Sequence, residues 1–462
     1  MNYDGETIAA IASGCTDSGI GIIRISGEEA LKVTARLFIP KNKKTDIHFM
    51  KSYTAHYGFI QNPENGEIID ECIILYMKGP HSYTGEDTIE IDAHGGMYVC
   101  NRILQLVCKN GARIAQPGEF TKRAFLNGRM DLTQAEAVMD VIQADNENAL
   151  KISVNQLRGE LKNHIIQMRS TILNKNAYIE YALDDPEHVS LDGFSQELYD
   201  VVQDLLLQIE NLLKHAEDGR IVKEGIQTAI VGKPNAGKSS LLNQLLRQER
   251  AIVTEIPGTT RDTLEERAIV NGIPLNIIDT AGIRETEDIV EKIGVDKAKK
   301  VILDANLILY VMDSSRPLEK DDYDIISLIE NKKVIVLLNK SDLDCELKKN
   351  EISHLLDAPV ISVSMLDNSG MEEFYDTLKN MFFHGDIAMK DSVMISNERQ
   401  KEALFRAEES LKQVKTSIEN GMSEDFYTID LMDAYEQLGM IIGESVHDDL
   451  VNEIFAEFCT GK

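Results

Sequence analysis

Hydrophobic and polar positions along this chain form three different patterns. In the first region, short runs of apolar and β-branched residues are separated by Gly and Pro, which is typical of an α+β domain. Two later regions repeat apolar residues every three or four positions, as helices do, and between them buried strands alternate with helical segments. The pattern predicts an α+β domain at residues 1–118 and an α/β domain at 223–385, inserted into an all-α helical domain at 119–222 and 386–462.

The same runs place individual elements. Strands of the first region are expected at residues 20–26, 68–76 and 88–92. In the helical region, TQAE at 133–136 predicts a capping box, apolar residues recur at helical spacing from Leu157 to Ile172, and DDP at 184–186 predicts a break. Buried parallel strands of the inserted domain are expected at residues 227–231, 275–278, 307–311, 334–338 and 360–363.

Composition narrows the functional classes. With 48 Lys and Arg against 77 Asp and Glu, the net charge is −29, which argues against a nucleic-acid binder that works by surface charge alone. Six cysteines without a CxxC pair suggest neither a disulfide framework nor a zinc site. No apolar run reaches the roughly 20 residues of a membrane helix, and the acidic start does not resemble a signal peptide. We therefore expect a cytoplasmic protein without a membrane partner.

A phosphate-binding motif lies in the inserted domain. Residues 232–239 read GKPNAGKS and match G-x-x-x-x-G-K-[ST], between an expected strand and an expected helix. In this motif backbone N–H groups and the helix N-terminus surround phosphate. Lys238 would reach the β- and γ-phosphate oxygens, and the hydroxyl of Ser239 would ligate Mg²⁺. The alternative is a Gly-rich turn before a helix that has no phosphate-binding function, and the match at every position of the motif argues against it.

Two further motifs follow expected strands. DTAG at 279–282 comes after a hairpin whose turn is Asn271-Gly272, and a carboxylate there can hold Mg²⁺ through water. NKSD at 339–342 follows the strand at 334–338. The carboxylate of Asp342 can accept hydrogen bonds from the N1–H and 2-amino groups of guanine, which adenine lacks, and Asn339 can meet the other edge of the base. Three motifs in this order predict a guanine-nucleotide hydrolase.

Two features concern the hydrolysis step. Ile283 stands where Ras-like GTPases carry a water-orienting glutamine, so another group must position the water. Glu285, Glu287, Asp288 and Glu291 are candidates, although spacing alone favours a solvated acidic loop. Asn235 and the loop at 254–262 offer oxygen atoms suited to a hard cation, and within that loop Thr259 and Thr260 can close over Mg²⁺ and the γ-phosphate.

The N-terminal region offers weaker signals. Strand alternation over 88–94 places Glu90, Asp92 and His94 on one face, which is either a solvated face or one side of a ligand pocket. Arg24 interrupts an apolar strand, and an edge-strand arginine that reaches solvent is the default interpretation. Cys459 would by default be a fraying terminal residue.

Several motifs together resemble one family. GIIRISG at 21–27, HSYTGED at 81–87, HGG at 94–96, PGEFTKRAFLNG at 117–128, the inserted GTPase and the terminal FCTGK at 458–462 are similar to the MnmE (TrmE) family of tRNA-modification GTPases. The resemblance runs nearly end to end. It implies a K⁺-activated GTPase that dimerises through its G domains.

The resemblance also implies roles in the GTPase site. Glu291 would position the attacking water, which replaces the preference for a solvated loop. Oxygen atoms of Asn235, Thr254, Ile256 and Thr259 would hold K⁺, and Ser239 and Thr260 would hold Mg²⁺. The nucleotide-binding set would then comprise Asn235, Ala236, Gly237, Lys238, Ser239, Ser240, Thr254, Glu255, Ile256, Pro257, Gly258, Thr259, Thr260, Asp279, Thr280, Ala281, Gly282, Asn339, Lys340, Asp342, Ser364, Met365 and Leu366.

For the N-terminal domain, the resemblance implies a fold that binds a tetrahydrofolate derivative through Arg24, Glu90, Arg129 and Lys462. Cys459 would be required for the modification. The chain would act as a homodimer with a flavoprotein partner, MnmG, which uses FAD and NADH. With methylene-tetrahydrofolate as one-carbon donor, the two would install an aminomethyl or carboxymethylaminomethyl group at C5 of the wobble uridine of certain tRNAs.

Some residues depart from the family pattern, and other functions stay open. SML at 364–366 replaces the usual Ser-Ala-Lys of the base-contacting loop, and LDDP at 183–186 replaces a Phe-containing turn. One alternative is an assembly GTPase that binds ribosomal RNA, which would need a basic appendage. Another is a stand-alone folate-dependent methyltransferase, which would not need the GTPase.

Overall fold

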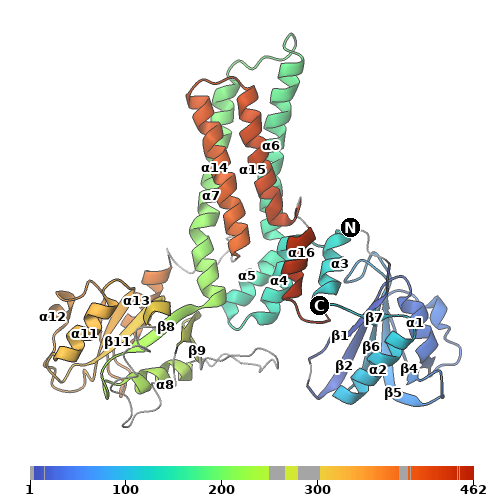
Figure 1. The fold of residues 1–462 in the computed structure, drawn as a ribbon, viewed down its shortest axis with the longest axis horizontal. Helices are drawn as coiled ribbons and strands as arrows, with labels where there is room; N and C mark the ends of the chain where they lie inside the picture. The colour runs from blue at the N-terminus through green and yellow to red at the C-terminus, as the bar shows by residue number, and fades with distance from the viewer. Residues whose placement is uncertain are drawn as a thin grey trace. The chain divides into compact units, whose positions relative to one another are not determined.

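The computed structural model describes residues 5–14, 16–248, 266–278, 302–383, 394–395, 397–444, 446 and 448–461 (Figure 1). The chain forms two compact units. Unit 1 comprises Met1–Met139, Gln156–Pro186 and Leu431–Lys462, and unit 2 comprises Asp140–Asn155 and Glu187–Asp430. The helical residues are divided between the two units. The domain boundaries drawn from the sequence stay predictions.

Unit 1 is built on a seven-stranded sheet with the order β3-β4-β5-β6-β2-β1-β7. All neighbours pair antiparallel except β1 and β7. Helices α1 (Ala30–Leu37) and α2 (Met97–Lys109) pack on the sheet, where Ile89, Ile91 and Ala93 are buried as the alternation predicted. The expected strands are confirmed, and the bounds are β1 Ile8–Ile11, β2 Ser18–Ser26, β3 Phe38–Pro40, β4 Thr54–Gln61, β5 Ile68–Met77, β6 Thr88–Gly95 and β7 Arg113–Ile114.

The helical residues of the N-terminal half correct two sequence interpretations. Helix α4 (Leu132–Gln143) is capped by Asp131, whose Oδ1 accepts from the N–H groups of Thr133 and Gln134, while Gln134 Oε1 accepts from Asp131 N. The capping box predicted at 133–136 is therefore wrong by two residues. The periodic run from Leu157 to Ile172 is not one helix, because Gly159 at φ 83° separates α5 (Glu147–Leu157) from α6 (Glu160–Asp184).

Other predictions about the helices are confirmed. Helix α6 ends at Asp184, where the DDP break was expected. In unit 2, α7 (Phe194–Glu224) and α14 (Glu398–Glu419) lie side by side (Figure 1). The remaining helices outside the α/β part are α3 Glu119–Leu126, α15 Asp425–Ile442 and α16 Asp448–Ala456. None of the helices within the described ranges has both the length and the apolar character needed to cross a bilayer.

The sheet of unit 2 has six strands in the order β13-β12-β11-β8-β10-β9. Every pair is parallel except β9 with β10, whose hairpin turn is Asn271-Gly272, as predicted. Both turn residues have positive φ (50° and 79°), as a type I′ turn requires. The strands are β8 Ile226–Val231, β9 Glu266–Val270, β10 Ile273–Ile277, β11 Leu307–Asp313, β12 Val334–Asn339 and β13 Val360–Ser362.

Helices cover both faces of this sheet. Leu309 and Val311 of β11 share a core with α8 (Lys238–Gln248) and α13 (Met371–Phe382). The alternate residues Ile308 and Tyr310 share a core with α11 (Lys320–Ile329) and α12 (Lys349–Ser353). A strand that is apolar on both sides is the mark of a parallel sheet between two helical layers. The predicted α/β architecture is confirmed.

Candidate nucleotide site

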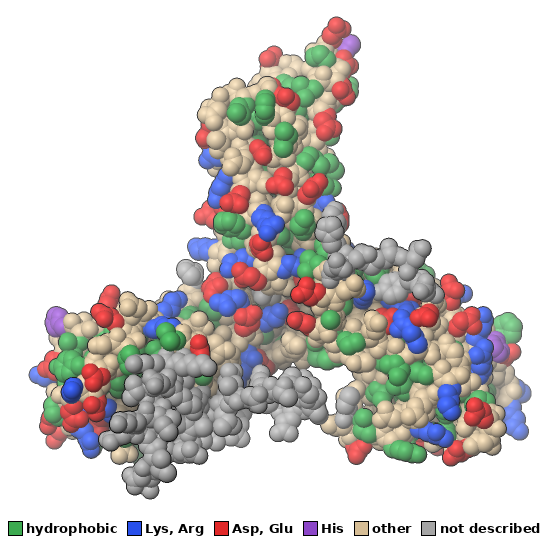
Figure 2. Space-filling model, in the orientation of Figure 1, with side chains coloured by type: hydrophobic (Ala, Val, Ile, Leu, Met, Phe, Trp, Pro, Cys, Tyr) green, Lys and Arg blue, Asp and Glu red, His purple; other side chains and the backbone are tan. Residues whose placement is uncertain are grey.

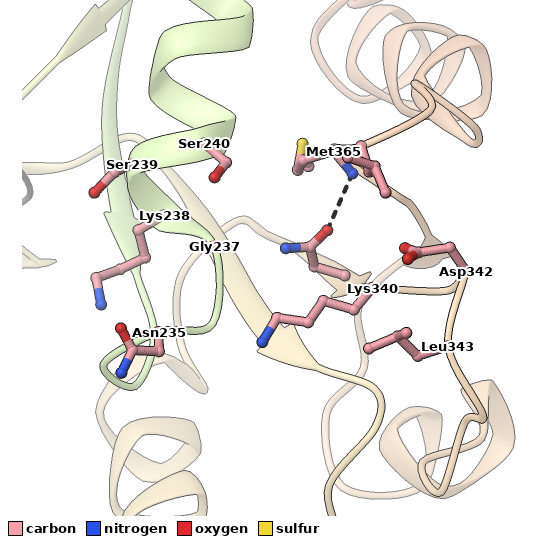
Figure 3. A pocket seen from close by; sticks show the side chains of 11 residues that line it. Asn235, Gly237, Lys238, Ser239, Ser240, Lys340, Asp342, Leu343 and Met365 are labelled. Carbon is pink, nitrogen blue, oxygen red and sulfur yellow. Dashed lines mark hydrogen bonds between the residues drawn. The ribbon is translucent and has the colours of Figure 1, made fainter.

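One pocket lies at the carboxyl edge of the unit 2 sheet. Because β8, β11, β12 and β13 are parallel, the loops that follow them emerge at the same edge, which is where ligands bind in such sheets. The pocket has a volume of about 400 Å³ (Figure 3). Its lining residues come from three loops, from the first turn of the helix after β8 and from the end of β12, namely Asn235, Gly237, Lys238, Ser239, Ser240, Asn339, Lys340, Asp342, Leu343, Met365 and Leu366.

The first of these loops is the GKPNAGKS segment between β8 and α8. Asn235 adopts φ 62° and Gly237 φ 108°, so the loop passes through left-handed conformations before the helix begins. Lys238 Nζ donates to the carbonyl oxygens of Gly232 and Lys233, at 2.8 Å each. Burial lowers the pKa of Lys238 from its ordinary value. The ammonium group therefore lies at the loop that would receive phosphate, beside the N-terminus of α8.

Asn339 joins two of the loops. Its Nδ2 donates to Ala236 O at 2.8 Å, and its Oδ1 accepts from Met365 N at 3.3 Å, which is the dashed line in Figure 3. The side chain is buried, and a Cβ on Gly237 would overlap Nδ2. Sequence reasoning assigned Asn339 only a contact with the base. In the structure it also holds the first loop against the 364–366 loop.

The pocket residues that follow β12 and β13 along the chain comprise two charged and three apolar side chains. Asp342 and Lys340 come from the loop after β12, where Lys340 adopts φ 64° and its Nζ lies 2.6 Å from Asp313 Oδ2. Leu343, Met365 and Leu366 supply apolar lining. A flat base with hydrogen-bond donors on one edge fits such a slot, since the Asp342 carboxylate accepts from those donors.

Lys233 anchors the first loop from outside the pocket. Its Nζ lies 2.6 Å from Asp322 Oδ2 and 3.0 Å from Glu319 Oε2, and both acids belong to the capping box that opens α11. Burial lowers the pKa of Lys233, but these two carboxylates raise it more, so the net shift is upward. The sequence analysis missed this lysine and Asp313. Both could have been found by asking which charged residues emerge at the same sheet edge.

The expected nucleotide-site residues that do not line this pocket lie either next to it or outside the described residues. Ala236 and Ser364 are buried next to the pocket, where Ser364 Oγ accepts from Leu366 N at 3.3 Å. The expected residues of the other two loops lie outside the described residues: Thr254, Glu255, Ile256, Pro257, Gly258, Thr259, Thr260, Asp279, Thr280, Ala281, Gly282 and Glu291. The acidic candidates Glu285, Glu287 and Asp288 and the aliphatic Ile283 lie there as well.

A second group of expected residues meets in unit 1. Arg24 pairs with Glu90 at 2.9 Å, and its Nη1 donates to Gly461 O at 3.3 Å. The guanidinium carbons of Arg24 and Arg129 lie 5.1 and 5.2 Å from the Tyr83 ring centroid. Burial raises the pKa of the Tyr83 hydroxyl, opposed by its hydrogen bond with Thr121 and by the two arginines.

Two default interpretations of this region are wrong. Arg24 does not sit on an edge strand, because β2 lies between β6 and β1, and its side chain is only 13% exposed. The described part of the C-terminal tail, which extends to Gly461, does not fray. Cys459 O accepts from Gly118 N at 3.3 Å, although Cys459 itself is exposed, and Gly461 packs against Ile11. Lys462 lies outside the described residues.

Surface charge bears on the alternative functions. On the visible face, acidic and basic side chains are interspersed, and the basic ones do not gather into one extended area among the described residues (Figure 2). A continuous basic stripe is the footprint expected of a protein that tracks a phosphate backbone. The face shown in Figure 2 does not present one.

Comparisons with known proteins cover nearly the whole chain. A family model described as the MnmE helical domain matches residues 132–459, and one described as the GTP-binding protein TrmE N-terminus matches residues 7–129. A protein named tRNA modification GTPase MnmE from Lachnoclostridium phytofermentans is 54% identical over 99% of both chains. A protein of the same name from Thermoanaerobacter pseudethanolicus is 47% identical over 99% of both chains. Another, from Enterococcus faecalis, is 45% identical over 100% of this chain and 99% of the other.

Proposed function

This chain belongs to the MnmE family of tRNA modification GTPases, and from that premise we propose that it hydrolyses GTP in the modification of tRNA. The observation that carries the proposal is the pocket at the carboxyl edge of the unit 2 sheet. There one loop offers backbone amides and Lys238 for phosphates, and another offers Asp342 for a guanine edge. Both ends of one nucleotide are thereby recognised.

The donor atoms near Lys238 fit a magnesium ion. The hydroxyl of Ser239 lines the pocket in the first turn of α8, and an oxygen donor suits this hard cation. Ser239 and Thr260 would hold Mg²⁺, which would neutralise charge on the β- and γ-phosphates. The residues of this chain would then bind and orient the triphosphate. Substituting Lys238→Ala should abolish GDP binding as measured by calorimetry, with Lys223→Ala outside the pocket as control.

Hydrolysis is proposed to depend on K⁺. Asn235 lines the pocket and presents an amide, and with Thr254, Ile256 and Thr259 it would give an all-oxygen set for this cation. The ion would supply positive charge where other GTPases use an arginine finger. GTP turnover should be many-fold faster in KCl than in NaCl at equal ionic strength, and equal rates would remove the proposal.

Glu291 is proposed to position the attacking water, as the family resemblance implies, and Ile283 has no polar atom for that task. The Glu291→Ala variant should lose hydrolysis while its affinity for GTP stays within a few-fold. Glu287→Ala serves as the matched control in the same acidic run. A normal rate in Glu291→Ala would assign the water to another residue.

The unit 1 cluster is proposed to bind a tetrahydrofolate derivative. Glu90 offers a carboxylate for the amide and amino donors of a pterin, and Arg24, Arg129 and Lys462 offer cations for its glutamate tail. The Tyr83 ring, which lies close to the guanidinium groups of Arg24 and Arg129, would suit a flat ligand. Calorimetry with 5-formyl-tetrahydrofolate should give binding that Glu90→Gln weakens at least tenfold, whereas no heat with the unaltered protein would contradict the site.

The product and partners are also proposed. The chain would act in the cytoplasm as a homodimer with a flavoprotein partner, MnmG, that uses FAD and NADH. Together they would place an aminomethyl or carboxymethylaminomethyl group at C5 of the wobble uridine, with Cys459 required. Mass analysis of tRNA from cells lacking this protein should show unmodified wobble uridine, restored by the natural gene but not by Lys238→Ala. Normal wobble uridine with defective ribosomal particles would instead indicate an assembly GTPase.

A further inference from the structure

An aspartate outside every recognised motif pairs with a lysine that lines the nucleotide pocket. Asp313 is the last residue of β11 and is paired in register with Asn339, the last residue of β12. Lys340 comes next and turns back through a left-handed conformation at φ 64°. The two side chains therefore emerge at the same sheet edge, where Lys340 Nζ lies 2.6 Å from Asp313 Oδ2.

The Asp313 carboxylate is itself fixed in orientation. Its Oδ1 accepts from Ser315 N at 3.1 Å and from Ser315 Oγ at 2.6 Å, so that Oδ2 faces Lys340. Arg316 Nε is 3.7 Å from Oδ2, and the Arg316 side chain is largely exposed. Burial raises the pKa of Asp313, but the hydrogen bonds from Lys340 and Ser315 lower it more, so the carboxyl is ionised at neutral pH.

Lys340 lines the pocket while its charge is paired with Asp313. It lies across from Met365 (Figure 3), and Asp313 accepts a hydrogen bond from its ammonium group. The methylene groups of a lysine form an apolar surface when the charged end is fixed elsewhere. A free lysine would lose rotamer freedom each time a base was bound, and a lysine that is already held loses less.

We propose that Asp313 is a positioning residue for the guanine base, because it holds the Lys340 ammonium so that the lysine stem lies against the purine. This inference rests on the nucleotide function proposed above and adds a residue to it. Replacing one partner of a partly exposed charged hydrogen bond is expected to weaken GDP binding about threefold to tenfold.

The experiment is a double-mutant cycle measured by calorimetry with GDP. Asp313→Asn removes the charge, Lys340→Met removes the ammonium while keeping an apolar stem, and the double variant removes both. If Asp313 acts through Lys340, Asp313→Asn weakens binding in the natural background and adds nothing in the Lys340→Met background. Should Asp313→Asn not fold, Lys340→Met alone must still weaken binding, and unchanged affinity in that variant overturns the inference.

The chain contains a closely matched control. Lys223 Nζ and Asp140 Oδ1 are also 2.6 Å apart, with side chains 30% and 8% exposed against 32% and 9% for Lys340 and Asp313. Neither residue of the control pair lines the pocket. Asp140→Asn and Asp313→Asn should lower the unfolding temperature of the nucleotide-free protein by similar amounts, and only Asp313→Asn should weaken GDP binding.

The outcomes separate the inference from the function it rests on. If the natural protein gives no heat with GDP, the nucleotide function fails. If it binds GDP and Asp313→Asn binds equally well, only the inference fails. Additive losses in the cycle, or equal losses in Asp140→Asn and Asp313→Asn, also overturn it, because they show a general effect of the ion pair on folding.

Discussion

Gly237→Ala should nearly abolish GDP binding without unfolding the protein. Gly237 adopts φ 108°, which an L-residue rarely accepts, and a Cβ there would overlap Asn339 Nδ2. The free variant can relieve the overlap by moving the first loop or Asn339. Nucleotide binding requires the first loop and Asn339 to return to the positions that they have in the natural protein. The free energy of the restored overlap is therefore lost from the binding free energy.

The magnitude follows from the contacts of Asn339. Moving its amide breaks the hydrogen bonds to Ala236 O at 2.8 Å and from Met365 N at 3.3 Å, worth about 1 kcal/mol each. Holding alanine in the left-handed backbone conformation of Gly237 adds a conformational cost of about 1–2 kcal/mol to this loss. A total of about 3–4 kcal/mol corresponds to roughly 150- to 1,000-fold weaker binding.

Two controls isolate the cause. Gly193→Ala has the same kind of backbone, with φ +79°, but no atom lies within 4 Å of the added Cβ, so its GDP affinity should not change. Combining Gly237→Ala with Asn339→Ala removes the overlapping atom, and the double variant should bind better than the sum of the single losses predicts. Isothermal titration with GDP measures the natural protein, the single variants Gly237→Ala, Gly193→Ala and Asn339→Ala, and the double variant. Less than about tenfold loss in Gly237→Ala, or full additivity, would refute the reasoning.

Three further outcomes are expected. Asp131→Ala should lower the free energy of unfolding by about 1 kcal/mol in urea titrations, because α4 loses its N-cap, and no change would place the cap elsewhere. Burial raises the pKa of Glu119, but hydrogen bonds from Arg113, Gln116 N and Arg123 lower it more, to about 2. Because the folded-state pKa of Glu119 lies below its unfolded value, this carboxylate stabilises the fold above about pH 4.5, and the stabilisation is lost as the pH falls toward 2. Glu119→Gln should therefore lose less free energy of unfolding than the natural protein when the pH is lowered. Equal losses of free energy would contradict this. Arg267 pairs with Asp145 at 2.8 Å, so Asp145→Ala should increase amide hydrogen exchange in β9, and unchanged exchange would show that the pair does not hold that strand.

Local patterns predicted much of the fold because they depend on nearby residues. The parallel strands at 307–311 and 334–338 are continuous apolar runs, and both are buried on both faces. The Asn271-Gly272 turn was predicted because a type I′ hairpin needs two residues with positive φ. The first loop and Asp342 were predicted to act together, and they line one pocket.

Other features depend on contacts that spacing does not encode. Arg24 was assigned to an edge strand because the sequence does not give strand order, and its partner Glu90 is 66 residues away. The N-cap of α4 is Asp131, two residues before the predicted N-cap Thr133, because the Asp131 carboxylate already accepts from the N–H groups of Thr133 and Gln134. The pair of Asp313 and Lys340 required the β11–β12 register, which appears only once the sheet is formed.

Base recognition by Asp342 tests the central claim most directly. Isothermal titration should show that the natural protein binds GDP and binds ADP at least about 100-fold more weakly, because adenine lacks the two donors that a carboxylate accepts. Asp342→Asn should then prefer xanthosine diphosphate over GDP, since an amide donates to the 2-oxo group that replaces the amino group. Equal binding of GDP and ADP by the natural protein, or an unchanged preference in Asp342→Asn, would contradict a guanine-specific pocket at this sheet edge.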